Sequence, residues 1–264
     1  MLVCAGCGRI GYNPIGLQDD GSTPQDDGST TPDEDAAVDP DLLVWIPFDD
    51  DPRSGAVDQQ GVLAPGQCAV GRCPLSEPGI MGRSYRFDGT DDYVQFATVN
   101  ALDFGAQNQP FTVSLWYLAS DVSPPLQQVL MAQATASGGV AYQLALENFQ
   151  GLAPLDTIWK VCESDCQSGT FAIDTDKTVQ GAWTFVVGTW DGSTSRLFVD
   201  AVEVGSAPKS TIAFDGNPLM VGADLEAGDV IEDSLDGAID DLRIYTRTLS
   251  IADQMQLMDE AKNP

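Results

Sequence analysis

Histidine is absent from all 264 residues of this chain. Its imidazole is the usual general base of Ser-His-Asp and Cys-His hydrolases and a frequent ligand of zinc and non-haem iron. The sequence therefore excludes hydrolases that depend on such a relay, together with any metal centre held by histidine.

Basic residues are scarce, because 12 lysines and arginines stand against 40 aspartates and glutamates, a formal net charge of −28. A surface with this charge repels phosphate backbones and anionic lipid headgroups, so we expect no nucleic-acid partner. A divalent cation is the natural counter-charge for so many carboxylates.

A long apolar run is missing as well. The longest stretch without a charge, residues 122–146, contains Pro124, Pro125 and a Gly-Gly pair among several glutamines. A helix that spans a membrane needs about 20 mostly apolar residues. This stretch is therefore not a membrane helix.

The first residues, MLVCAGCGRIGY, resemble the end of a bacterial lipoprotein signal peptide. The resemblance implies that Cys7 is lipidated and that residues 1–12 are the remnant of the signal and anchor. Two features depart from the pattern: Cys4 stands where Leu is usual, and the segment before Cys7 is short. A start codon placed downstream of the true one would explain the short segment. The alternative is a cytoplasmic protein in which both cysteines are incidental.

A lipidated Cys7 predicts an extracytoplasmic protein that is tethered to the cell envelope and touches the membrane only through its lipid anchor. Gly8 rather than Asp follows Cys7, which by resemblance to lipoprotein sorting favours the outer membrane; secretion is the alternative. Residues 13–40 carry two copies of DDGST and eight acidic residues without an aromatic. They predict a disordered acidic linker, since they cannot bury enough apolar surface to fold.

Four further cysteines form two close pairs, Cys68 with Cys73 and Cys162 with Cys166. Short polar loops between paired cysteines in an oxidising compartment predict two disulfides, each worth about 2 kcal/mol. The alternatives are unpaired buried thiols or half of a four-cysteine metal site, although such sites normally use C-x2-C spacing.

From Leu42 onward, short runs of β-branched and aromatic residues are broken by Gly, Asp, Asn and Pro. This pattern predicts an all-β fold, a two-sheet antiparallel sandwich over residues 41–264, with a loop between the strands Leu42–Phe48 and Ser84–Asp88. Ser250 as cap and Asp253 at the capping-box position predict a short C-terminal helix, with Ile251, Met255 and Met258 along one side.

The ordered segments between residues 42 and 260 resemble the LamG-like (laminin G-like), concanavalin A-like family. The resemblance implies a two-sheet jelly roll that most often binds glycans or proteins and frequently carries one structural calcium. One hairpin departs from the family, which usually has Asn-Gly where this chain has Asp200-Ala201. The segments that carry the resemblance are LVWIPFDDD at 43–51, GRSYRFDGTDDYVQF at 82–96, FTVSLWYLAS at 111–120, WTFVVGTWDGSTSRLFVDAVEVGSA at 183–207, PLMVGAD at 218–224 and LDGAIDDLRIYTRTLSIADQMQLM at 235–258.

Aspartates that such a jelly roll would bring together are candidate calcium ligands, because calcium takes six to eight oxygens. The resemblance suggests Asp49 or Asp50 after the first strand, Asp58 in the next loop and Asp240 in the last strand. Asp240 shares strand parity with Leu242, so it is expected to point inward and to need a partner. The alternative partners are backbone NH groups or one of three arginines, Arg53, Arg83 and Arg86.

Sugar sites stack saccharides on exposed aromatic rings, and Trp159 and Tyr142 are the candidates here; packing in the core is the alternative. A sandwich glycosidase commonly carries E-x-D-x-x-E, which this sequence lacks. We therefore predict a non-catalytic binding module whose partner is a glycan or a cell-surface protein. The rival functions are a glycoside hydrolase or polysaccharide lyase of the same fold and a purely structural envelope protein.

Overall fold

The computed structural model of the protein describes residues 39–123, 127–134, 140–148, 154–163, 171–174, 178–213, 216, 218–226 and 230–262. The folded unit begins at Asp39, two residues before the predicted domain start. Asp39 belongs to it because the Nη2 of Arg247 lies 2.6 Å from the Asp39 Oδ2. Cys7 and Cys166 lie outside the described residues.

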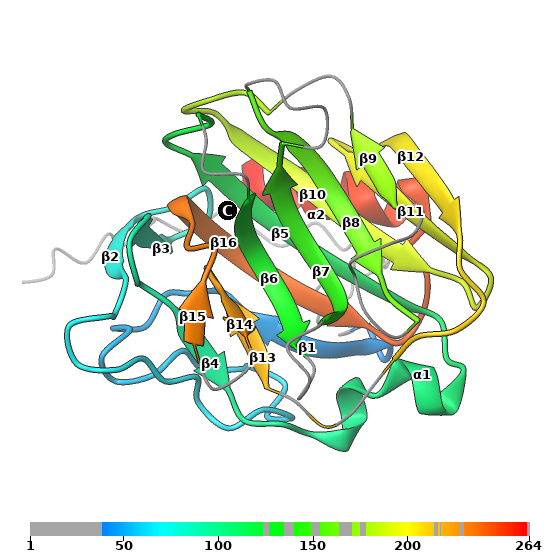
Figure 1. The fold of residues 1–264 in the computed structure, drawn as a ribbon, viewed down its shortest axis with the longest axis horizontal. Helices are drawn as coiled ribbons and strands as arrows, with labels where there is room; N and C mark the ends of the chain where they lie inside the picture. Colours follow the sequence, from blue (N-terminus) through cyan, green and yellow to red (C-terminus); the bar gives the residue numbers. More distant parts are fainter. Residues whose placement is uncertain are drawn as a thin grey trace, which may run out of the picture. The chain divides into compact units, whose positions relative to one another are not determined.

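The described strands form two large antiparallel sheets and a small hairpin (Figure 1). The 8-stranded sheet has the order β12-β11-β10-β5-β16-β3-β2, with β1 also paired to β16, and the 6-stranded sheet has the order β4-β13-β6-β7-β8-β9. The bounds in the first sheet are β1 Leu42–Ile46, β2 Leu75–Pro78, β3 Arg83–Asp88, β5 Phe111–Ala119, β10 Trp183–Trp190, β11 Thr194–Val199, β12 Val202–Pro208 and β16 Asp236–Tyr245. Those in the second are β4 Val94–Phe96, β6 Gln127–Ala134, β7 Val140–Glu147, β8 Asp156–Val161, β9 Ala172–Asp174 and β13 Leu219–Val221, and the hairpin is β14 Asp224–Glu226 with β15 Val230–Glu232.

Alternation along the strands places the main core between the two sheets. In β5 the side chains of Phe111, Val113, Leu115 and Tyr117 enter that core, while Trp116 joins a second apolar cluster on the opposite face of the same sheet. The predicted fold, an all-β antiparallel sandwich of the concanavalin A type with a C-terminal helix, is confirmed.

Helix α2, Ile251–Lys262, covers the outer face of the 8-stranded sheet, and its N-terminus has the predicted capping box. The Asp253 backbone NH donates to the Ser250 Oγ at 3.2 Å, and the Ser250 NH donates to the Asp253 Oδ2 at 2.7 Å. The buried residues of this helix are Gln254, Leu257 and Ala261. The expected apolar side faces the sheet only in part, because Met258 packs against the outer cluster whereas Ile251 and Met255 are about half exposed.

Two short helical turns, η1 Asn100–Leu102 and α1 Phe104–Gln107, connect β4 to β5. Among the described residues, no helix is long and apolar enough to cross a membrane.

The hairpin between β11 and β12 keeps a tight turn without glycine. Asp200 has φ 48° and Ala201 has φ 62°, the left-handed values that a type I′ turn requires at both central positions. Ala201, which stands where the family usually has glycine, therefore bears backbone strain, because its Cβ disfavours this region.

Strand β16 contains a bulge that changes the direction of its side chains. Its pairing with β5 shifts register between Asp240 and Arg243, and Asp241 has φ 50°. Ile239 and Leu242, three residues apart, both enter the main core. Asp240 consequently does not share the inward parity of Leu242, which corrects the expectation from simple alternation.

Candidate ligand-binding groove

The long connection from β1 to β2 is organised by one buried aspartate. The Oδ1 of Asp58 accepts from the backbone NH of Trp45 at 2.9 Å and of Gln60 at 3.0 Å. Its Oδ2 accepts from the NH of Val62 at 2.8 Å and of Leu63 at 2.9 Å. These four bonds satisfy the carboxylate and fix the loop path without any need for a cation.

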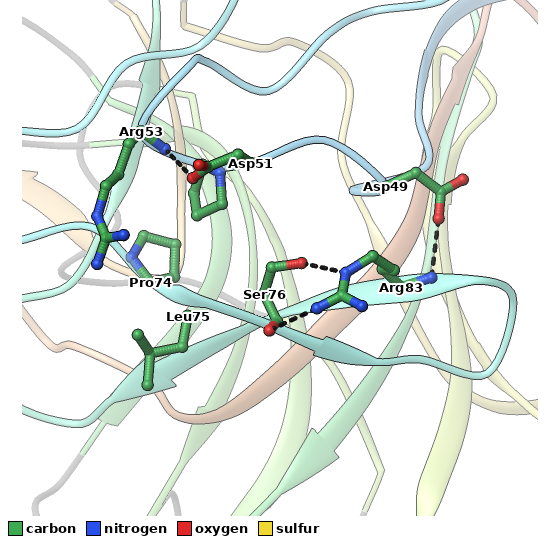
Figure 2. Close-up of a pocket in the computed structure, with 8 residues that line it drawn as sticks. Asp49, Asp51, Arg53, Pro74, Leu75, Ser76 and Arg83 are labelled. Atoms are coloured by element: carbon green, nitrogen blue, oxygen red, sulfur yellow. Dashed lines mark hydrogen bonds between the residues drawn. The ribbon is translucent and has the colours of Figure 1, made fainter. Parts of the chain in front are cut away.

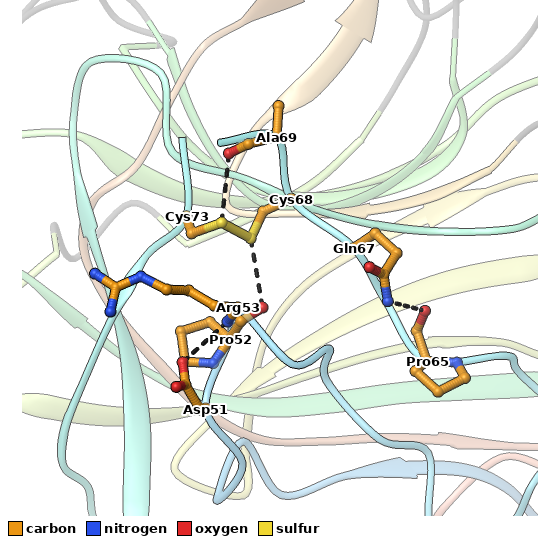
Figure 3. Close-up of a disulfide and its surroundings, with 8 residues drawn as sticks. All are labelled: Asp51, Pro52, Arg53, Pro65, Gln67, Cys68, Ala69 and Cys73. Atoms are coloured by element: carbon orange, nitrogen blue, oxygen red, sulfur yellow. Dashed lines mark hydrogen bonds between the residues drawn. A yellow bond between two sulfur atoms is a disulfide. The ribbon is translucent and has the colours of Figure 1, made fainter. Parts of the chain in front are cut away.

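A disulfide and a tight turn fix the next part of this connection. Cys68 and Cys73 are joined, as predicted, and the Cys68 sulfur lies 3.4 Å from the carbonyl oxygen of Pro52. The backbone NH of Arg53 donates to the Asp51 Oδ1 at 3.0 Å, an Asx turn. Figure 3 shows the Arg53 side chain extending beside the disulfide.

Beside this turn lies a groove with a volume of about 370 Å³. Pro52 and Pro74 form buried parts of its lining, Leu75 and the charged residues are exposed, and Ser76 is half-buried. Figure 2 shows Arg53 and Arg83 at opposite ends of the groove in this view. The complete lining is Asp49, Asp51, Pro52, Arg53, Pro74, Leu75, Ser76 and Arg83.

Arg83 is held in place by strand β2. Its Nε donates to the Ser76 Oγ at 2.5 Å and its Nη2 donates to the Ser76 carbonyl oxygen at 2.8 Å. Its backbone NH donates to the Asp49 Oδ1 at 2.8 Å. One end of the groove is therefore a fixed guanidinium, with a carboxylate anchored beside it.

A second hollow of about 350 Å³ adjoins the first and shares Arg53 with it. Its other lining residues are Cys68, Val70, Gly71 and Cys73. Val70 is fully exposed, and Leu75 in the first hollow is 61% exposed. Together the two hollows, which we call the edge groove, offer apolar surface next to donors and acceptors of hydrogen bonds, the composition of a small-ligand site.

The predicted calcium ligands are not brought together. Asp49 gives one oxygen to the Arg83 NH, Asp58 gives both of its oxygens to four amides, and Asp50 lies near Tyr85. Burial, followed by the charges of Asp50 and Asp51, raises the pKa of the Tyr85 hydroxyl well above its ordinary value. Among the described residues, the four predicted aspartates do not form a converging group of three carboxylates, so the geometry gives no support to a calcium ion held by this set.

Asp240 lies on the outer face of the 8-stranded sheet, beneath the turn between β2 and β3. Its Oδ2 accepts from the Met81 NH at 2.9 Å, as the backbone alternative predicted, and its Oδ1 has no partner among the described residues. Burial, with a smaller contribution from the charge of Asp241, raises the pKa of Asp240 to about 7. Glycine at position 79 leaves room for the Asp240 carboxylate, because a Cβ there would stand 2.3 Å from its Oδ2.

A different acidic group does converge in the turn after β3. One oxygen from each of Asp88, Asp91 and Asp92 lies within 4.8 Å of the others. The contacts of this turn explain the arrangement, because the Asp92 Oδ2 accepts from the Asp88 NH and Asp91 pairs with Arg72 at 3.1 Å. Burial, followed by the neighbouring charge of Asp88, raises the pKa of Asp92.

Trp159 and Tyr142 are core residues, so their predicted role as sugar-stacking rings does not fit the structure. Their exposures are 0% and 1%, and the two rings pack against Phe111. The Trp159 Nε1 donates to the Thr189 carbonyl at 3.0 Å. Gly188 makes room for the indole, since a Cβ there would lie 2.4 Å from it.

Cys162 is also disulfide-bonded, and its predicted partner, Cys166, lies outside the described residues. Disulfides of this kind fit an oxidising compartment.

A family model described as the concanavalin A-like lectin/glucanases superfamily matches residues 88–253, more than half of the chain. The chain belongs to this superfamily. No curated protein matches the chain by sequence.

Several solved structures have a fold similar to that of this chain. Domain 4 of AbnA, a GH43 extracellular arabinanase from Geobacillus stearothermophilus in complex with arabinotriose, is 17% identical with a TM-score of 0.59, over 82% of this chain and 97% of that one. The receptor-binding domain of botulinum neurotoxin D is 13% identical with a TM-score of 0.61, over 83% and 52%. Trypanosoma rangeli sialidase is 12% identical with a TM-score of 0.61, over 90% and 36%. The chain thus spans about half of the toxin domain, and these low identities establish the fold alone.

Within the superfamily fold, the edge groove was not predicted from the sequence. Strand β2, which supplies Leu75 and Ser76, falls in a stretch that was expected to be a loop. The run Asp51-Pro52-Arg53-Ser54-Gly55 is a turn signal, because Asp and Pro favour Asx and β-turns. It could have located the bend at Arg53, but it carries no information about which strand lies opposite.

Proposed function

We propose that this superfamily member is a non-catalytic carbohydrate-binding module that acts outside the cytoplasm and uses the edge groove as its sugar site. The observation that carries the proposal is the convergence of two guanidiniums and two carboxylates around an exposed apolar surface in one groove. Sugars present hydroxyls around their rim and CH groups on their faces, so they need both kinds of contact at once.

Similar proteins support carbohydrate as the ligand class. The arabinanase domain was solved with arabinotriose, and a botulinum neurotoxin DC binding domain was solved with SialylT. A protein partner is the second candidate, because the same toxin binding domain was also solved with rat synaptotagmin II.

Some similar structures are enzymes, including the sialidase. Glu147, the last residue of β7, bears on a hydrolytic role. Its Oε2 lies 2.6 Å from the Nζ of Lys160, which is nearly buried. A carboxylate paired with a nearly buried lysine supports a structural role for Glu147.

The disulfides support a place outside the reducing cytoplasm. Lipidation of Cys7 and attachment to the cell envelope extend this proposal. Metabolic labelling of the expressed protein with an alkyne-bearing fatty acid tests it, with Cys7→Ser as the variant that should lose the label.

A glycan array with the full chain, followed by calorimetric titration of the strongest hit, tests the sugar site. Arg83→Gln should weaken binding about tenfold, because a tenfold change corresponds to 1.4 kcal/mol and a hydrogen bond from a charged donor is worth about that much. Arg196→Gln is the matched control: it removes the same charge from a partly exposed arginine paired with Asp191. Absence of any glycan hit, or equal binding by both variants, would contradict the proposal.

A further inference from the structure

Arg53 differs from the other arginines in the described part of the chain. Each of the others has a side-chain bond to an acidic or polar group. These pairs are Arg72 with Asp91, Arg83 with Ser76, Arg86 with Asp236, Arg196 with Asp191, Arg243 with Asp241 and Glu260, and Arg247 with Asp39, Asp41 and Asp253. The Arg53 guanidinium has no such bond to any described residue, although the chain carries 40 acidic groups.

The backbone that carries this unpaired guanidinium is held in place. The Asx turn bonds the Arg53 NH to Asp51, the Ser54 NH donates to the Asp51 carbonyl at 2.8 Å, and the disulfide stands against Pro52. Arg53 thereby lines both hollows of the edge groove (Figures 2 and 3). An exposed cation on a rigid turn, between two hollows, is placed to meet an anionic group of a ligand.

We infer that the edge groove takes a sugar acid and that Arg53 binds its carboxylate. This inference rests on the proposed carbohydrate function and names the class of sugar. A guanidinium pairs with a carboxylate through two parallel hydrogen bonds, a geometry that neutral hydroxyls do not reproduce. The exposed Leu75 lies where it can contact the CH face of the sugar ring.

The other charges of the groove favour a monoanionic, hydroxyl-rich ligand over a phosphate or an acidic peptide. Asp49 and Asp51 each give one oxygen to a backbone NH, and no bond to their other oxygen is found among the described residues. Such oxygens accept from sugar hydroxyls but repel a second negative charge. The net charge of −28 penalises a multiply charged ligand further.

Calorimetric titration of the full chain with matched probes tests the assignment. The acidic probes are methyl α-galacturonoside and 3′-sialyllactose, which carry one carboxylate each, and their neutral counterparts are the methyl ester of the galacturonoside and lactose. The acid of at least one pair should bind about tenfold or more tightly than its neutral counterpart. Arg53→Gln should remove this preference, Arg53→Lys should retain part of it, and Arg196→Gln should leave it unchanged.

The outcomes separate this inference from the proposed function. If neutral glycans bind as tightly as acidic ones, or if Arg53→Gln keeps the preference for the acid, the sugar-acid assignment is wrong while the glycan-binding function stands. If no glycan binds, on the array or in titration, both are wrong. The thermal midpoint of Arg53→Gln should match that of the unmodified chain, since the side chain has no described partner to lose.

Discussion

The inter-sheet core and the region between residues 47 and 83 are built by different means. In the core, strands place apolar side chains by alternation, and rings such as Trp159, Phe111 and Tyr142 fill the space between the sheets. In the region 47–83, the chain follows a path set by Asp58, by the Asx turn at Asp51 and by a disulfide. Stability therefore depends mainly on the first region, and the candidate site lies in the second.

This difference shows why the superfamily fold can serve many ligands. Removing one core ring leaves a cavity that neighbouring strands cannot close. Side chains of the groove, such as Arg53 and Leu75, are exposed and can change without disturbing the core. Binding residues on loops held by a rigid scaffold can thus vary independently of the fold.

The largest effect should come from the core. Trp159→Ala removes a fully buried indole and leaves the Thr189 carbonyl without its donor, so the free energy of unfolding should fall by about 3–5 kcal/mol. Urea denaturation followed by circular dichroism measures it. Tyr142→Phe is the control in the same cluster: its buried hydroxyl has no partner in the described part of the chain, so its loss should cost less than about 1 kcal/mol. A loss of less than about 1 kcal/mol for Trp159→Ala would contradict the view that stability depends mainly on the inter-sheet core.

Much of the core could be predicted from the sequence because alternation is a local property. Alternation in the run FTVSLWY puts Phe111, Val113, Leu115 and Tyr117 on one face, and these residues line the main core. The capping box at Ser250 was equally local and is present. Tyr142 and Trp159 were also in strands, but their exposure depended on what covers the sheet, which no local pattern records.

The site depended on features that alternation does not encode. The bulge at Asp240 and Asp241 reverses the side-chain direction in β16, and a single residue in the left-handed region is enough to do so. The edge groove forms because strand β2 returns beside the turn at Arg53, a contact between segments that the sequence shows only as separate loops. Which of these segments lie side by side could not be inferred from one sequence.

Asp240 offers the second test, because it is a buried carboxyl beneath the turn that ends β2. Its pKa, raised to about 7 by burial, exceeds the value of about 3.9 for an unfolded chain. The native state therefore holds a proton that the unfolded state releases, so stability falls as pH rises from about 4 to 7. The loss is at most about 4 kcal/mol and is constant above that range.

The pH dependence of unfolding measures this effect as the difference between the unmodified chain and Asp240→Asn. The Asn carbonyl can still accept from the Met81 NH, but Asn does not titrate. The free energy of unfolding of the variant should therefore fall less between pH 4 and 7, and the variant should be the more stable protein at pH 8. Other titrating groups, including Asp92 with its raised pKa, cancel in the difference. Parallel curves for the two proteins between pH 4 and 7 would show that Asp240 is ionised throughout.

Asp58 tests whether the region 47–83 is organised by side-chain bonds to the backbone. Asp58→Ala removes the acceptor of four NH groups, including that of the buried Leu63, and should lower the free energy of unfolding by about 2–3 kcal/mol. Asp51→Ala, whose carboxylate accepts one bond at the surface, should cost less than about 1 kcal/mol. Equal effects in urea denaturation would mean that the loop is held by other contacts.

The disulfide should give a smaller change in stability than Trp159, Asp240 or Asp58, together with a specific change in binding. Replacing Cys68 and Cys73 by Ser frees a short loop, which costs about 2 kcal/mol in the chain-entropy model. Because the disulfide stands against Pro52, its loss should also loosen Arg53 and weaken sugar binding several-fold, whereas Arg83 remains bonded to Ser76. Titration of the double variant, compared with the unmodified chain at equal folded fraction, separates the two effects. Unchanged affinity would show that the Asx turn alone positions Arg53, and that the two regions are more alike in their rigidity than their construction suggests.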